Sequence, residues 1–336
     1  MSTPTIRDVA ARAGVSVATV SRVLSEDPRT SASSREKVFA AAAEMGFRPN
    51  AQARSLRRTR TDTIGVLLSD VRNPFFAEIA HTVAQTALAS DIATLLCNAD
   101  ESTEQQDHAL DLLVSQRVDG IIVTPQGDGS GSLRDVLKLG LPVVFVDRVI
   151  DGVDVPSVTS DNRSGVTAAV EHLAALGHRR ISFVAGPQET STGRERLVAY
   201  REAIAAAGLD TDPALVYQGD FRVASGVAGA RALLDLDDAP TALVAADSLM
   251  TFGVLQECQD RGVRIGDEVS VIGYDDIDSF RLVNPPVTVI AHDPARMGAL
   301  AVAMIRDLLA GEPVTSAVLA SNLVERASTG PARRSA

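Results

Sequence analysis

The chain has 336 residues, a length that predicts two or three domains rather than one. Hydrophobic residues make up 45% of it and aromatic residues only 4%, so we expect cores built from Ala, Val, Leu and Ile. No apolar run approaches the roughly 20 residues that span a bilayer, and no apolar stretch of signal-peptide type opens the chain. The sequence therefore predicts a cytoplasmic protein with no membrane partner.

Charge is divided unevenly along the chain. Residues 1–60 carry a net charge of +6 and the remainder carries −17, which together give −11 for the whole chain. A basic head on an acidic body is expected when the head meets DNA phosphates and the body does not. Random variation in surface charge is the alternative for this observation alone.

Three short helices are predicted near the start of the chain. Residues 5–8 form a capping box that opens the first helix, and Gly14 ends that helix in a tight turn. Ser16 is the predicted N-cap of the second helix, Val17–Leu24. A second capping box at residues 33–36 is predicted to open the third helix.

The first two helices and their glycine turn have the form of a helix-turn-helix. In such a unit the second helix enters the major groove of DNA, with its N-terminal side chains toward the bases. Short helices with small outward residues also occur in plain α-helical bundles, and spacing alone leaves both interpretations open. The side chains expected to face outward from the second helix are Val17, Ala18, Ser21 and Arg22.

The residues of this segment resemble a known family. VAxxAGVSxATVSRVL, followed by SxxxREKVxxAxxEMGFRPNAQARSL, is similar to the DNA-binding segment of the lactose-repressor/galactose-repressor family of bacterial regulators, over residues 5–56. The resemblance implies that Val17, Ala18 and Arg22 read bases, Arg22 through guanine. It also implies a set of residues that hold phosphates or sugars: Thr5, Ser16, Thr19, Ser21, Arg29, Ser31 and Asn50.

A short segment links this head to the rest of the chain. Asn50 can cap a helix over residues 51–56, but a helix below ~12–15 residues is marginal in water and needs a partner. The resemblance implies that two such hinge helices pair in the minor groove, with Ala53 and Arg54 at the DNA and Leu56 wedged between base steps. The alternative is that Leu56 anchors the linker to the body.

From Asp62 onward, short apolar runs alternate with helical stretches. Buried strands that alternate with amphipathic helices predict parallel sheets covered on both faces, and the remaining length predicts two such lobes. Ligands of these folds bind at the carboxyl ends of the strands. The predicted strands are residues 64–68, 93–97, 120–123, 143–146, 181–184, 242–245 and 269–272. The predicted helices include residues 76–90, 105–115, 163–176, 194–207 and 224–234.

This part resembles the periplasmic-binding-protein-like effector domain of the same family. The similar segments are, in order, IGVLLSDVRNPFF, VDGIIV, PVVFVDR, LGHRRI, STGRERLVAY and SVIGYDD. The resemblance implies an α/β body whose chain crosses between two lobes three times. The division it implies is a DNA-binding head at 1–49, a hinge at 50–61, an N-terminal lobe at 62–161 with 292–320, and a C-terminal lobe at 162–291 with 321–336.

Candidate ligand contacts follow from the chemistry of a cleft between such lobes. Charged side chains at strand ends can fix hydroxyl groups, and two aromatic rings can sandwich the ring of a ligand. The alternative is that the charges form surface ion pairs and the aromatic residues belong to the core. Together with the family pattern, this chemistry gives as candidate contacts Asn73, Phe76, Asp147, Arg148, Arg196, Phe221, Asp275 and His292.

Three positions bear on the class of effector. Ala246 stands where many sugar-binding members have Asn, and His292 stands where many have Gln. Thr190 occupies a position that is basic in purine-responsive members, which argues against a purine. We expect a monosaccharide or its phosphate.

No pattern in the sequence indicates catalysis. The five histidines show no metal-ligand spacing, and Cys97 and Cys258 fit no metal or disulfide framework. The sequence contains no nucleophile elbow and no phosphate-binding loop. We therefore expect no enzyme activity, no catalytic residue, no metal and no cofactor.

These observations predict a homodimeric, ligand-responsive transcriptional regulator, most simply a repressor. One short helix reads too few bases, whereas a two-fold pair reads a palindromic operator. Closure of the lobes around a small molecule would align or separate the two hinges. Two alternatives stay open: a sugar-binding receptor for transport or sensing without DNA function, and a regulator whose DNA affinity rises with ligand.

Overall fold

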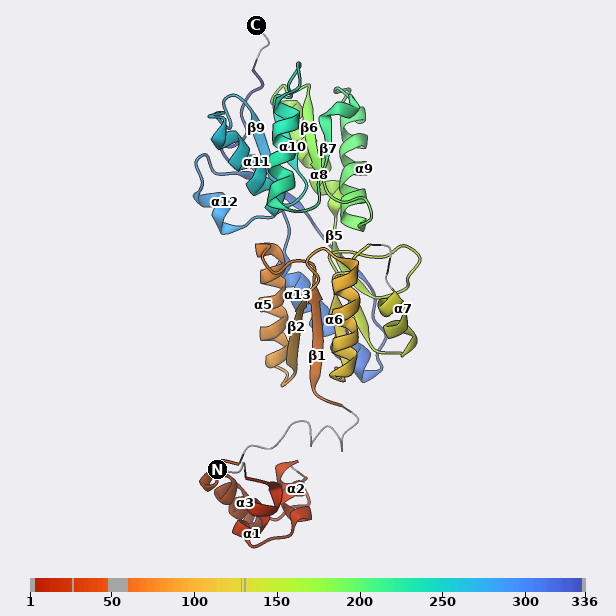
Figure 1. Cartoon of the computed structure of the whole chain (residues 1–336), viewed down its shortest axis with the longest axis vertical. Helices are drawn as coiled ribbons and strands as arrows, with labels where there is room; N and C mark the ends of the chain where they lie inside the picture. Colours follow the sequence, from red (N-terminus) through yellow and green to blue (C-terminus); the bar gives the residue numbers. More distant parts are fainter. Residues whose placement is uncertain (1–3, 26, 48–59, 128, 130, 334–336) are drawn as a thin grey trace. The chain divides into compact units, whose positions relative to one another are not determined.

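The computed structural model describes residues 4–25, 27–47, 60–127, 129 and 131–333 (Figure 1). The chain forms two compact units, Met1–Thr61 and Asp62–Ala336. Four DNA-contact candidates lie outside the described residues: Asn50, Ala53, Arg54 and Leu56. Within the described ranges, no helix is both long enough and apolar enough to cross a membrane.

The first unit contains three helices, α1 (Ile6–Ala13), α2 (Val17–Leu24) and α3 (Ala32–Glu44). Gly14 makes the predicted turn between α1 and α2, with a φ of 65° in the left-handed region that favours glycine. Small apolar side chains from all three helices form one core. Its buried members are Val9, Ala10, Val20, Val23, Val38, Ala41 and Ala42.

Side-chain oxygens satisfy the first amides of these helices. The predicted capping box of α1 is confirmed, since the N–H of Thr5 donates to Oδ2 of Asp8 over 2.7 Å. The predicted N-cap of α2 is also confirmed, because Oγ of Ser16 accepts the N–H of Thr19 over 3.1 Å. The helix-turn-helix geometry is therefore set by local sequence.

The predicted start of α3 is wrong. Instead of a capping box at residues 33–36, Oγ of Ser31 accepts the N–H of Ser34 over 3.2 Å, and the helix begins at Ala32. Ser31 offers the same hydroxyl oxygen two residues earlier, so the helix gains length without losing its cap.

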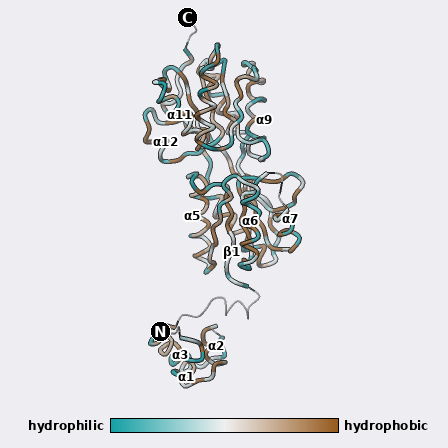
Figure 2. Tube along the Cα trace, in the orientation of Figure 1, coloured by the Kyte–Doolittle hydropathy of each residue, from teal (hydrophilic) through white to brown (hydrophobic). Residues whose placement is uncertain are grey.

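The N-terminal lobe of the second unit is built on a fully parallel six-stranded sheet of order β11-β5-β4-β3-β1-β2. Helices α5 (Pro74–Leu88) and α13 (Pro294–Ala310) pack on one face, and α6 (Thr103–Ser115) and α7 (Gly131–Lys138) on the other. Figure 2 shows β1 as largely hydrophobic, as expected of a strand buried on both faces. The strands are β1 (Thr63–Leu68), β2 (Ala93–Asn98), β3 (Gly120–Val123), β4 (Val143–Val146), β5 (Ser157–Ser160) and β11 (Ala317–Leu319).

The C-terminal lobe repeats this plan with a six-stranded sheet of order β12-β10-β9-β8-β6-β7, in which only β12 runs antiparallel to its neighbour. The strands are β6 (Ile181–Ala185), β7 (Val216–Gln218), β8 (Ala242–Ala245), β9 (Ser270–Tyr274), β10 (Thr288–Ala291) and β12 (Asn322–Val324). The helices are α8 (Asn162–Ala175), α9 (Ser191–Ala206), α10 (Val223–Leu234), α11 (Ser248–Asp260) and α12 (Asp278–Leu282), with a 3-10 turn η1 (Pro213–Leu215).

The chain passes between the two sheets three times: from β5 to α8, from β10 to α13, and from β11 to β12. As a result α13 packs against α5, β3 and β4, which precede it by more than 140 residues of chain. The predicted two-lobed α/β body with parallel sheets is confirmed, and the carboxyl ends of both sheets meet between the lobes (Figure 1).

The predicted strand at residues 93–97 is present as β2, but its predicted burial is wrong. This strand lies at the edge of its sheet, where Leu95 and Leu96 are exposed, Leu96 to 53%. An edge strand lacks a neighbour on one side, so an apolar run alone does not establish burial. The central strands β3, β4 and β8 match their predicted residues at both ends.

Helices α10 and α11 approach each other closely because glycines face glycines. A Cβ atom on Gly253 would overlap the carbonyl oxygen of Val223, and one on Gly226 would overlap the carbonyl oxygen of Met250. Both obstacles are backbone atoms, so neither can move aside as a flexible side chain would.

Gly253→Ala is expected to destabilise the protein by roughly 1–3 kcal/mol, the usual range for overpacking. Thermal and urea unfolding of the full chain would measure this loss. Gly131→Ala is the matched control, since a Cβ at this helical glycine would meet nothing within 4 Å. Equal stability of the two variants would show that the α10–α11 crossing relaxes freely.

Candidate functional site

A pocket with about 260 Å³ of empty space lies between the lobes, where the carboxyl ends of the two sheets face each other. This space is partly open to solvent, and a cleft at the carboxyl ends of parallel strands is where folds of this kind bind small molecules. The N-terminal lobe supplies Asn73, Phe75, Phe76, Asp147 and Arg148 to its lining. The C-terminal lobe supplies Thr192, Arg196, Phe221, Asp247 and Asp275.

Three lining residues have left-handed backbone: Asp147 at φ 64°, Phe221 at φ 62° and Asp275 at φ 64°. This conformation is rare for residues other than glycine, above all for a bulky one such as Phe, and such strain gathers at functional sites. Asp147 directly follows β4 and Asp275 directly follows β9, so the two lobes present equivalent carboxylates to the pocket.

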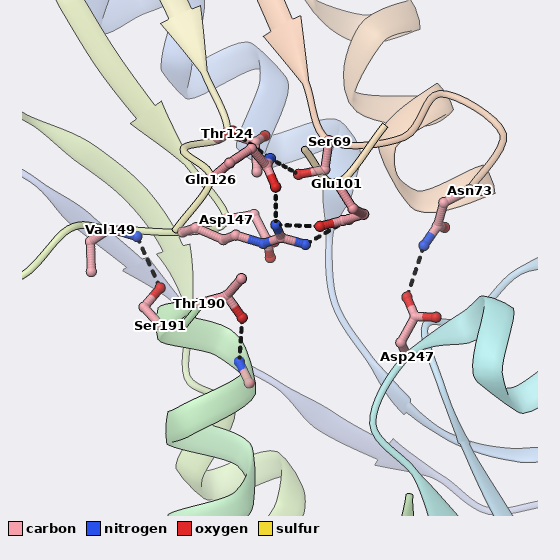
Figure 3. Close-up of polar contacts among 12 residues, drawn as sticks. Ser69, Asn73, Glu101, Thr124, Gln126, Asp147, Val149, Thr190, Ser191 and Asp247 are labelled. Atoms are coloured by element: carbon pink, nitrogen blue, oxygen red, sulfur yellow. Dashed lines mark hydrogen bonds and ion pairs between the residues drawn. The ribbon is translucent and has the colours of Figure 1, made fainter. Parts of the chain in front are cut away.

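Both terminal nitrogens of the Arg148 guanidinium donate hydrogen bonds to side chains of the same lobe (Figure 3). Its Nη1 and Nη2 donate to the two carboxylate oxygens of Glu101 over 2.7 and 2.8 Å, and Nη1 also donates to Oε1 of Gln126 over 3.0 Å. The guanidinium carbon lies 5.1 Å from the ring centre of Phe221 and 6.0 Å from that of Phe76. The two rings expected to sandwich a ligand, Phe76 and Phe221, also flank this cation.

Arg196 is held by three groups of the C-terminal lobe. Its Nε donates to Oδ1 of Asn162 over 2.8 Å, and its Nη1 donates to the carbonyl oxygen of Ala246 over 2.7 Å. Its guanidinium stacks on the ring of Tyr274, 3.9 Å from the ring centre. Its Nη2 lies 3.9 Å from Oδ1 of Asp147 in the other lobe.

Direct hydrogen bonds join the lobes at the edge of the pocket. Nδ2 of Asn73 donates to Oδ2 of Asp247 over 3.0 Å, and Oγ of Ser248 donates to Oδ1 of Asn73 over 2.9 Å (Figure 3 shows the first). Because Oδ1 of Asn73 also accepts the backbone N–H of Phe75, the orientation of the amide is settled. Elsewhere the N–H of Val149 donates to Oγ of Ser191 over 3.0 Å.

The pocket carboxyl groups resist ionisation. Burial raises the pKa of Asp247 to about 8 and, against the opposing charge of Arg196, raises the pKa of Asp275 to about 7. Burial also raises the pKa of Asp147. Each of these groups is more costly to ionise inside the closed pocket than in water.

In the head, the outward face of α2 is available to a partner. Val17, Ala18 and Arg22 project from it, and the Arg22 side chain lies along its own helix, where Nε donates to the carbonyl oxygen of Ala18 over 3.3 Å. The phosphate candidates Thr5, Ser16 and Ser31 serve as N-caps, and Thr19 shares a hydrogen bond with Ser16 over 2.9 Å. Ser21 is half-buried on α2, and Arg29 forms a two-point pair with Asp27, whose pKa this pairing lowers to about 2.

Comparison with known proteins gives a consistent answer along the chain. Residues 5–50 match bacterial regulatory proteins of the lacI family, and residues 170–329 match a periplasmic binding protein-like domain. Catabolite control protein A of Priestia megaterium is 32% identical, over 94% of this chain and 95% of that protein. The chain belongs to the lacI family of bacterial regulatory proteins. It is accordingly a DNA-binding transcriptional regulator.

Other similarities of this lacI-family regulator extend over both of its units. The transcriptional repressor PurR of Photobacterium profundum is 34% identical, over 90% of this chain and 91% of that protein. A lac repressor dimer bound to operator and the anti-inducer ONPF matches with a TM-score of 0.87 at 30% identity, covering 98% of this chain and 100% of that chain. A CelR–cellobiose complex matches with a TM-score of 0.74 at 34% identity, over 97% and 99% of the two chains.

The regulator's pocket brings together seven of the eight predicted ligand contacts. The exception is His292, which does not line the pocket. Its Nδ1 shares a hydrogen bond with Oγ of Ser321 over 3.0 Å, and its ring lies 5.0 Å from that of Tyr274 and 6.2 Å from that of Phe75. Burial lowers the pKa of His292 to about 3, so this ring is neutral. Ligand contact by the other seven residues stays a prediction.

Sequence reasoning missed three lining residues, Phe75, Thr192 and Asp247. For Asp247 a signal was present, because an Asp that follows a strand and precedes a helix is a typical N-cap, and its Oδ1 accepts the N–H of Met250 over 2.9 Å. Within the described ranges, no group of three or more His, Cys, Asp or Glu is placed to hold a metal ion.

The regulator without ligand is expected to lose stability as the pH rises from about 4 to about 7. Burial raises the pKa of Asp275 from the ordinary aspartate value of 3.8 to about 7, so in this range the folded state holds a proton that the unfolded state releases. Asp275→Asn should flatten the dependence of the melting temperature on pH. Asp135→Asn, at an exposed position of α7, is the control and should leave the slope unchanged. An equally steep slope in both variants would contradict the prediction.

Proposed function

We propose that this lacI-family regulator acts as a repressor that binds a palindromic DNA operator as a homodimer, under the control of a sugar or sugar phosphate in the interlobe pocket. The observation that carries the proposal is the pocket itself. Seven side chains expected from the sequence to contact an effector come from both lobes and line one small cavity. A receptor for transport would use such a pocket too, but it would not need the basic helix-turn-helix head.

Operator recognition is assigned to the head. Val17, Ala18 and Arg22 project from α2 and would meet base edges, Arg22 through guanine. The N-terminal amides and capping hydroxyls of α1, α2 and α3 would meet phosphates. The assigned contacts are Thr5, Ser16, Thr19, Ser21, Arg29, Ser31 and Asn50, with Ala53, Arg54 and Leu56 in the hinge. We propose that residues 1–49 form the DNA-binding head, residues 50–61 the hinge, and the residues from Asp62 onward the two-lobed body.

The effector acts through the lobes. Asn73 and Asp247 join the lobes directly, so a ligand that alters this contact alters their relative position. A ligand shifts the conformational balance only by its difference in affinity for the two arrangements. DNA must then change ligand affinity by the same factor. A transcriptional regulator acts by binding DNA rather than by converting a substrate. We therefore propose a cytoplasmic protein without catalytic activity.

Exposed apolar side chains support the homodimer. In Figure 1, α5 and α12 lie along the same side of the body, and the edge strand β2 packs against α5. Each of these three elements carries leucine that faces solvent in the single chain. Leu96 on β2 is exposed to 53% and Leu282 on α12 to 85%. A second copy covering this side would bury both.

The proposal as a whole is tested by retardation of DNA from the protein's own locus. The full chain should bind such DNA, and a chain that starts at Asp62, the second compact unit, should not. Equal binding by both chains would contradict the assignment of DNA recognition to the head, and binding by neither would favour the sugar-receptor alternative. Titrating sugars against the protein–DNA complex then distinguishes induction, in which the sugar lowers DNA affinity, from corepression, in which the sugar raises it.

Arg22→Ala should weaken operator binding by roughly 1–3 kcal/mol and relax the preference for one base. Arg12→Ala is a matched control, because Arg12 is exposed on α1 and pairs with Glu44. Fluorescence anisotropy with operator and with random DNA would measure both effects. An equal loss on the two DNAs would mean that Arg22 contacts phosphate only.

Leu96→Glu should convert the dimer to monomer, because it places a charge in the apolar contact. Leu139→Glu, at a leucine after α7 that is more exposed than Leu96, should remain dimeric. Sedimentation velocity of the full chain distinguishes the two outcomes. If the Leu96→Glu variant remains dimeric, the dimer interface does not include Leu96 of β2.

A further inference from the structure

Carboxyl groups outnumber guanidinium groups around the interlobe pocket. Two cations, Arg148 and Arg196, line it together with three buried aspartates, Asp147, Asp247 and Asp275. Glu101 takes both terminal nitrogens of Arg148, so that cation is already neutralised from outside the pocket. Nε of Arg148 and Nη2 of Arg196 both lie near Asp147, 3.7 and 3.9 Å from its carboxylate oxygens, which leaves Asp247 and Asp275 without an ion pair among the described lining residues.

Neither guanidinium offers a free edge to an anion. Recognition of a phosphate by Arg uses two parallel N–H donors. The Nη1–Nη2 edge of Arg148 is occupied by Glu101. Arg196 uses Nε on Asn162 and Nη1 on the carbonyl of Ala246, and its Nη2 points toward Asp147. A phosphate group in the pocket would have to displace one of these partners.

Other polar atoms of the lining await a partner. Oγ1 of Thr192 and Nε of Arg148 are buried and have no hydrogen-bond partner among the described residues. A buried polar atom without a partner is costly, so these two point to a ligand that supplies one. A hydroxyl group can do so, because it accepts from N–H and O–H and at the same time donates to a carboxylate such as Asp147 or Asp275.

We propose that the effector is an uncharged polyol, namely an unphosphorylated sugar, and that the three pocket aspartates exclude its phosphate ester. This inference rests on the proposed function, in which the pocket binds a sugar-class effector. Hydroxyls of the sugar would bridge Thr192 and Arg148 to Asp147 and Asp275. The raised pKa values of Asp247 and Asp275 agree with this, since a site that already disfavours its own negative charge also disfavours a ligand that carries two more.

The test compares each sugar with its own phosphate ester on the full chain. Thermal shift would screen matched pairs such as D-glucose and glucose 6-phosphate, D-ribose and ribose 5-phosphate, and D-galactose and galactose 1-phosphate, together with common disaccharides. Calorimetry would then give the two affinities of every pair that contains a hit. We expect the sugar to bind about tenfold or more tightly than its ester, a gap of one decade in Kd.

Variants locate the cause of that gap. At a pH above about 7, where Asp275 is ionised, Asp275→Asn should weaken binding of the sugar and narrow its advantage over the ester, because one negative charge is gone while the side chain keeps its shape. If Asp275→Asn abolishes binding altogether, Asp147→Asn provides the same test, with weaker sugar binding and a smaller advantage over the ester as the expected result. Asp135→Asn, exposed on α7, should change neither affinity.

The outcomes separate the inference from the proposed function. An ester that binds as tightly as its sugar, or more tightly, overturns the inference and leaves a sugar-class regulator in place. An unchanged gap in both Asp275→Asn and Asp147→Asn also overturns it, because the aspartates would then not be the cause. If no sugar and no ester stabilises the chain, the proposed effector class fails and the inference fails with it.

Discussion

Satisfying the buried charged groups around the interlobe pocket is the constraint on which the body depends. A guanidinium or carboxylate removed from water is costly unless partners satisfy it. Arg148 finds its partners in Glu101 and Gln126, which come from separate loops of one lobe. Asp247 finds one of its partners, Asn73, in the other lobe. The Asn73–Asp247 contact therefore favours one arrangement of the lobes, and a molecule that displaces either set of partners must supply hydrogen bonds in their place.

The two lobes meet this constraint in parallel ways. Each ends a central strand with an aspartate in left-handed backbone, Asp147 after β4 and Asp275 after β9. Each also contributes a buried arginine to the pocket. Parallel sheets place the carboxyl ends of their strands at one edge, so this edge is where side chains from distant segments can converge. The pocket is thus a consequence of topology, and its acidity is a consequence of which residues this chain carries there.

Local features of the structure could be predicted from the sequence, and features set by distant contacts could not. The caps at Thr5 and Ser16 were predictable because each cap involves residues three positions apart. Strands β3, β4 and β8 were predictable because central parallel strands are apolar throughout. The exposure of Leu96 was not, since it depends on which strand ends the sheet.

The candidate site likewise has features that the sequence could predict and features that it could not. Residues at strand ends, such as Asp147, could be placed in the pocket from their position in the sequence. His292 also follows a strand, β10, yet it lies against Tyr274 and outside the lining. The partners of Arg148 were beyond sequence reasoning, because Glu101 and Gln126 lie 47 and 22 residues away from it along the chain.

The three crossings between the lobes also set the order in which this protein becomes competent during synthesis. All contacts within α1, α2 and α3 lie in the first 47 residues, so the DNA-reading head is complete soon after it leaves the ribosome. The N-terminal sheet, in contrast, waits for α13 to cover one face and for β11 to extend its edge, and both are made after most of the C-terminal lobe. The DNA-binding head is therefore complete before the two-lobed body that responds to the effector.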